Sequence, residues 1–85
     1  MTVQQSYEIG LWQVPVYVRI GYGASESVHG PNEALTYLKD RWPAERGPHY
    51  DRAHQTCQLA TIRKRPGELA REAFIAAAIE ARIIA

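Results

Sequence analysis

LAREAFIAAAIEA, residues Leu69–Ala81, is the segment around which we expect this 85-residue chain to fold. At about 100° per residue it predicts a helix with one narrow face of small side chains. Alanine has the best helix propensity and adds little bulk, so a neighbouring backbone can approach this face closely, and Phe74 fills the remaining gap. The face is made of Ala70, Phe74, Ala77 and Ala81, with Ala73 and Ala78 on its flanks.

The same helix carries a second apolar stripe. Ile75 and Ile79, spaced i and i+4, lie among the charged side chains that should face water. Because an ordinary surface helix has one apolar stripe, this helix is either covered on both sides within the monomer or in contact with a partner. Scattered exposed isoleucines are also common on protein surfaces. We favour contact with a partner chain. The candidate contacts of a homodimer are Ile75, Ile79 and Ile83.

The composition is that of one ordinary small globular domain. The hydrophobic fraction is 46% and the charged fraction 22%, and ten Lys+Arg against nine Asp+Glu give a net charge of +1. This balance argues against a dedicated nucleic-acid binder, which carries a clear basic excess. One cysteine excludes an internal disulfide, and neither a signal peptide nor a membrane-spanning apolar run is evident. We therefore expect a cytoplasmic protein without membrane contact.

The first half of the chain predicts a β-hairpin. Residues 1–11 are weakly patterned and are interpreted as a loose N-terminal arm, and residues 12–85 as a single domain. From Trp12 to Ile20 apolar and other residues alternate, with Val14 on the buried side, which is typical of a half-buried strand. The glycines of Gly21–Ala24 suit a turn, and Ser25–His29 follows as a short return strand with Val28 facing inward.

The second half of the chain predicts three helices. Gly-Pro at the start, an acidic first turn and apolar residues at helical spacing indicate helices over Glu33–Arg41 and Tyr50–Lys64, before the one over Leu69–Ala81. The predicted fold class is therefore α+β, an N-terminal hairpin packed against three helices in the order ββααα. The last residues, Ile83–Ala85, either fray or lie along the sheet as a third short strand.

The sequence pattern supports neither a metal site nor a catalytic group. His54 and Cys57 are spaced i and i+3 on one predicted helix, and His49 and His29 would have to complete a zinc site, but the spacing matches no zinc pattern. A reactive cysteine needs an exposed electropositive setting, whereas Cys57 falls on an apolar stripe. We predict a packed core cysteine, with no catalytic residue, cofactor or metal.

Two further features suggest binding. Arg63, Lys64 and Arg65, expected in the last turn of the second helix, form a candidate weak basic patch for nucleic acid or a regulatory partner. Alternatively, these three residues are simply solvent-exposed at the C-terminal end of the helix, where positive charge complements the helix dipole. Trp12, Trp42 and Tyr50 could line a small-molecule pocket between the sheet and the helices, although aromatic residues in such patterns more often form a core.

A set of short motifs along the chain resembles a known family. The matching residues are Pro15-Val16, Gly21, Gly23, Val28, Glu33-Ala34-Leu35, Leu38, Trp42-Pro43, Gly47-Pro48, Ala53, Cys57, Ala70-Arg71, Ala73-Phe74, Ala77 and Glu80-Ala81. The resemblance covers about Trp12–Arg82, and the chain is similar to domain-of-unknown-function family 982, small proteins found mostly in plant-associated soil bacteria. The resemblance implies a lone small domain and leaves function open, since the family has no established activity. Arg82 departs from the pattern, in which a glycine is expected.

The function most consistent with these patterns is a non-enzymatic interaction module that forms a homodimer. The first alternative is a weak nucleic-acid or regulatory binder that uses Arg63–Arg65. The second alternative is a small-ligand binder with its site between sheet and helices.

Overall fold

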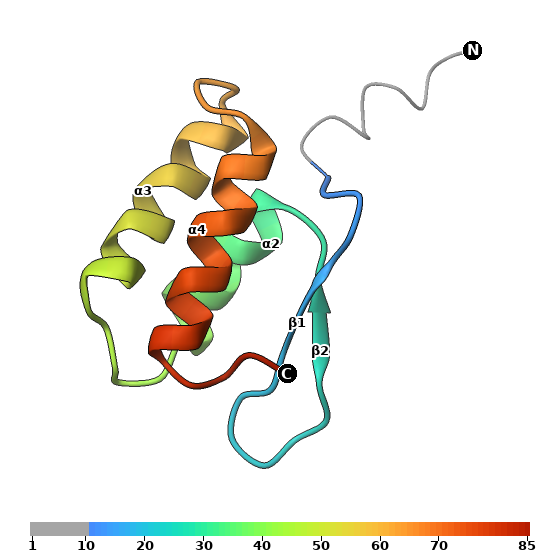
Figure 1. Ribbon diagram of the computed structural model, residues 1–85, viewed down its shortest axis with the longest axis vertical. Coiled ribbons are helices and arrows are strands. Elements are labelled where there is room, and N and C mark those ends of the chain that lie inside the picture. The colour runs from blue at the N-terminus through green and yellow to red at the C-terminus, as the bar shows by residue number, and fades with distance from the viewer. Residues whose placement is uncertain (1–10) are drawn as a thin grey trace.

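The computed structural model describes residues 11–85 and confirms an α+β fold in the order ββααα. Figure 1 shows the helices gathered on one side of the two strands. The predicted N-terminal arm, residues 1–11, lies outside the described part of the chain except for Leu11. The elements are β1 (Val16–Val18), β2 (Glu26–Val28), α2 (Pro31–Thr36), the π-helical segment η1 (Tyr37–Arg41), α3 (Pro48–Thr61) and α4 (Gly67–Glu80).

The sheet is antiparallel and β1 lies at its centre. β1 pairs with β2 so that Val16 faces Val28, and on its other side Val18 forms a bridge with Ile84. The Arg19 N–H donates to the Ile83 carbonyl at 2.8 Å, and the Ala85 N–H donates to the Tyr17 carbonyl at 3.0 Å. The C-terminus therefore lies beside β1, as Figure 1 also shows, instead of fraying.

The first strand is shorter than the alternation predicted. Val16 and Val18 are buried, but Val14 is 58% exposed, which corrects its assignment to the buried side. Pro15 explains the difference, since it has no N–H for a ladder and regular pairing begins only after it. Trp12 still faces the core. Its backbone N–H donates to the His29 carbonyl at 2.7 Å and fixes the segment that precedes Pro15.

The first predicted helix, Glu33–Arg41, ends where expected but begins earlier, at Pro31, and it changes geometry along its length. Proline at its first position starts α2, and the chain continues through η1 to Arg41. Trp42 then adopts an extended conformation before Pro43, as residues before proline do. Near this end the Tyr50 hydroxyl donates to the Leu38 carbonyl at 2.8 Å, where helix carbonyls otherwise lack partners.

The second helix begins and ends earlier than predicted, so the Tyr50–Lys64 boundaries are corrected to Pro48–Thr61. It ends in a Schellman motif: Arg63 has φ 63°, its N–H donates to the Ala60 carbonyl, and the Lys64 N–H donates to the Leu59 carbonyl. Arg63, Lys64 and Arg65 consequently lie in the loop after α3, and the prediction that they occupy its last turn was wrong.

α4 packs against α3, α2 and β1, and its predicted face of small residues is confirmed. Ala70, Phe74 and Ala77 are fully buried, and Ala73, Ala78 and Ala81 are buried beside them. The helix stops at Glu80 although glycine is missing, because Arg82 takes the left-handed conformation at φ 62°. The N–H groups of Arg82 and Ile83 then donate to the carbonyls of Ile79 and Ala78, which forms a second Schellman motif.

Phe74 is the centre of the core. The Trp12 ring lies 5.8 Å from it and the Trp42 ring 5.5 Å, both in tilted geometry. Each tryptophan is 5% exposed. Three large aromatic rings therefore fill the space where the sheet meets the helices, with Cys57 and Leu38 also fully buried.

Candidate functional site

The cysteine of α3 lies where the sequence pattern predicted it. Cys57 is fully buried, its Sγ lies 4.0 Å from the Ala70 carbonyl oxygen, and burial raises the pKa of the thiol to about 12. A thiol with this pKa stays protonated and unreactive at neutral pH. Among residues 11–85 there is no group of three or more His, Cys, Asp or Glu side chains placed to hold a metal ion.

A hollow lies at the end of α3 and not between the sheet and the helices. Its volume is about 660 Å³, within the range of small-molecule sites. The predicted pocket of Trp12, Trp42 and Tyr50 is instead filled by the aromatic core. We call this feature the basic hollow; it is lined by Leu11, Gly30, Pro31, Asn32, Glu33, Ala60, Thr61, Arg63, Lys64, Arg65, Pro66 and Gly67.

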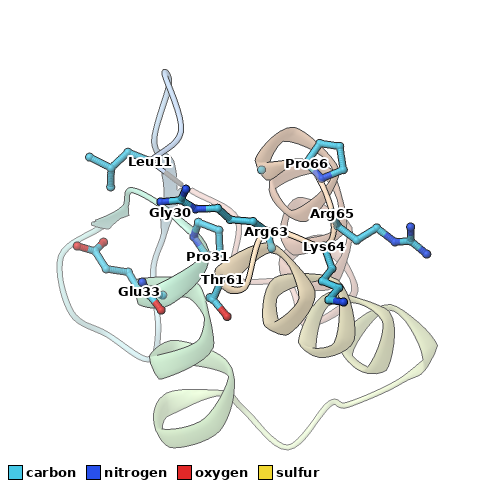
Figure 2. A pocket seen from close by; sticks show the side chains of 12 residues that line it. Leu11, Gly30, Pro31, Glu33, Thr61, Arg63, Lys64, Arg65 and Pro66 are labelled. Carbon is cyan, nitrogen blue, oxygen red and sulfur yellow. The ribbon is translucent and has the colours of Figure 1, made fainter. Parts of the chain in front are cut away.

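All three residues of the predicted basic patch line the basic hollow. Figure 2 shows the Arg63 side chain extending from the α3–α4 loop towards Gly30, whereas the head groups of Lys64 and Arg65 point away from that side. The three side chains form no ion pair within the described part of the chain. The structure thus brings the three residues to one concave surface but directs only Arg63 across it.

The three candidate isoleucines lie in different environments. Ile79 is 57% exposed on the outer face of α4. Ile75 is half-buried and packs against the core, and Ile83 is buried within the core at 6% exposure. Of the predicted dimer contacts, Ile79 presents the most surface, Ile75 presents part of its side chain, and Ile83 supports the monomer from inside.

Sequence reasoning missed the role of Glu80. Its carboxylate accepts hydrogen bonds from the backbone N–H groups of Gly47, His49 and Tyr50, each at 3.1 Å, and so caps the start of α3. Desolvation would raise the pKa of Glu80, but these three N–H groups and the nearby His49 outweigh it, and the pKa is lowered. The positive end of α3 is therefore already occupied by an anion from the same chain.

A second missed group ties the hairpin to the first helix. Glu26 on β2 accepts hydrogen bonds from both terminal nitrogens of Arg41, one at 2.7 Å, and from the Tyr37 hydroxyl at 2.8 Å. The hydrogen bonds from Arg41 and Tyr37 lower the pKa of Glu26 to about 2. The only sequence signal was the opposite charge of the two residues, 15 positions apart, and nothing local specified that they meet.

Comparison with known proteins matches this chain to a family whose function is not known. The model of the family described as "Protein of unknown function (DUF982)" matches residues 14–85. The chain is similar to an NMR structure of an Agrobacterium tumefaciens protein solved as a structural genomics target, with 30% identity and a TM-score of 0.79. That similarity covers 100% of this chain and 86% of the other. No curated protein matches. Within residues 11–85, none of the helices has the length and apolar character needed to cross a membrane.

Proposed function

This chain belongs to the DUF982 family, whose function is unknown, and we propose that it is a non-enzymatic interaction module that pairs with a second copy of itself through the outer face of α4. The observation that carries the proposal is the pattern on that face. Glu72, Ile75 and Ile79 lie on α4 and Arg82 in the turn that follows it, at intervals of three, four and three residues along the chain. This spacing reads the same in both directions, with opposite charges at its two ends.

A two-fold axis that crosses the outer face of α4 midway between Ile75 and Ile79 would use this symmetry. This axis places the second α4 antiparallel to the first, so that Ile75 lies opposite the partner's Ile79 and Glu72 lies opposite the partner's Arg82. Each contact then occurs twice. The isoleucines of the two chains pack against each other, and each glutamate lies opposite an arginine. Within the described part of the chain neither Glu72 nor Arg82 forms an ion pair, so both remain available to a partner.

The surface beside this stripe extends the apolar contact. Arg71 Nε donates to the Val14 carbonyl at 2.8 Å and holds that exposed valine next to α4. Burying Ile79 contributes about 1–2 kcal/mol per chain, which is less than the cost of association. Val14 and the charged pairs are therefore needed for a measurable dimer, and we expect a weak one.

Sedimentation equilibrium at tens of micromolar tests the dimer. We expect Ile79→Lys to yield a folded monomer, because the side chain is exposed and its loss costs the monomer fold little. Ile62→Lys is the matched control: that isoleucine is 62% exposed just after the end of α3, away from the stripe, and the change should leave the dimer intact.

A charge exchange tests the two-fold geometry. Glu72→Arg and Arg82→Glu, made singly, should each weaken the dimer because like charges then meet, and the double exchange should restore it. A wild-type monomer at tens of micromolar would end the proposal. A dimer that Ile62→Lys disrupts and Ile79→Lys leaves intact would move the interface to another face.

A further inference from the structure

The basic hollow has a chemical bias that the dimer does not use. It lies at the N-terminal end of α4, whereas the proposed dimer stripe begins at Glu72 and runs past the C-terminal end of that helix. Its lining carries three cations and one carboxylate. That carboxylate, on Glu33, is already engaged, since it accepts the backbone N–H of His29 at 2.9 Å. The lining residues therefore carry a formal net charge of +2, of which only the Arg63 guanidinium is directed across the hollow, and the single acid is hydrogen-bonded at the start of α2.

Hydrogen-bond donors without acceptors gather along one wall of the hollow. The guanidinium of Arg63 donates no hydrogen bond to another described residue. No side chain caps the N-terminus of α4, which begins at Gly67 in the wall itself. A surface with spare donors and positive charge favours an anionic ligand.

Part of the remaining lining is apolar. Leu11, Pro31, Ala60 and Pro66 contribute hydrocarbon surface, and Leu11 is 52% exposed at the rim. A bare inorganic anion would leave this surface uncovered. We propose that the basic hollow binds a small organic anion, a carboxylate or phosphate ester with an apolar body, whose acidic group pairs with the Arg63 guanidinium.

The geometry favours a small molecule over a nucleic acid. A polyanion needs several cations directed along one track. Here Lys64 and Arg65 point away from the side of the hollow that Arg63 spans, as Figure 2 shows, and the chain has a net charge of only +1. One arginine across a concave, partly apolar surface matches one acidic group.

Phenyl phosphate is a suitable probe, with benzyl alcohol as its uncharged counterpart, and a titration followed by ¹⁵N NMR is the measurement. We expect saturable shifts at the amides of Asn32, Arg63 and Gly67 with phenyl phosphate and none with benzyl alcohol. Arg63→Gly should weaken binding at least tenfold. Glycine suits the left-handed conformation there, so this variant keeps the fold.

Arg82→Gly is the matched control, because it makes the same change in the same backbone conformation at the other Schellman motif, outside the hollow. It should leave binding unchanged. Equal loss in both variants, or shifts that never saturate, would overturn the proposal. Tighter binding of a short single-stranded DNA that depends on Lys64 and Arg65 and falls steeply with salt would replace it with the nucleic-acid alternative. Because Arg82 also belongs to the proposed dimer contact, Arg82→Gly should weaken the dimer in sedimentation while leaving binding in the hollow unchanged, so the two measurements separate the two proposals.

Discussion

The Glu80 carboxylate lies so close to Gly47 that a Cβ at that glycine would stand 2.5 Å from Oε2. Real Cβ atoms do not approach other atoms to this distance, so the glycine leaves the space that the carboxylate occupies. The contact joins the end of α4 to the start of α3 across 33 residues. It explains why a helix that starts with Gly-Pro, and has no side-chain cap of its own, begins sharply.

This relationship predicts strong coupling between the two residues. Gly47→Ala should displace the carboxylate, and Glu80→Gln should weaken the hydrogen bonds by removing its charge. Each should lower the urea midpoint, and the double variant should lower it little more than either single change, because both remove one cap. Additive losses in this double-mutant cycle would show that the two residues act independently.

The ion pair of Glu26 predicts a dependence of stability on pH. The pKa of Glu26 is about 2 in the folded protein against an ordinary 4.5, so the unfolded chain binds its proton first. Its contribution to stability is therefore complete above pH 4.5 and is lost as the pH falls towards 2. Glu26→Gln should remove this part of the acid dependence, which urea unfolding between pH 2.5 and 6 measures. An unchanged slope would contradict the assignment.

Arg63 and Arg82 adopt the left-handed backbone conformation, and we predict that glycine at either position stabilises the protein. An L-residue in the left-handed conformation costs about 1–2 kcal/mol, and glycine recovers part of this at the expense of more freedom in the unfolded chain. We expect Arg63→Gly and Arg82→Gly each to raise the free energy of unfolding by about 0.5–1 kcal/mol in urea titrations. Ala81→Gly, one position earlier in a helical conformation, is the control and should lower it.

The buried cysteine predicts slow chemistry and a modest packing role. A thiol reagent should label Cys57 slowly in native protein and rapidly in denaturant, because both burial and a pKa near 12 suppress the thiolate. Cys57→Ala should cost about 1 kcal/mol as a small core truncation. Cys57→Ser should cost more, about 1–3 kcal/mol, since it buries a hydroxyl. Rapid native labelling would contradict the buried position.

Local periodicity was sufficient for the elements and the main buried face. The change from alternation before Gly30 to helical spacing after it specifies a hairpin followed by helices, and the alanines around Phe74 specify which side of α4 faces the core. Both signals depend only on residues that are close together in the sequence, so they can be recognised without knowledge of the rest of the chain. The burial of Cys57 followed from the same reasoning.

The contacts that join distant segments could not be read from these patterns. Glu80 looks like one more exposed acid of a helix, and its role depends on the start of α3 being brought beside it. Ile83 and Ile79 look alike in the sequence, yet the turn at Arg82 buries one and leaves the other exposed. The basic hollow likewise exists only because α2 packs beside the end of α3. Periodicity records which side of an element is apolar, whereas packing sets which elements meet and which charges lie together.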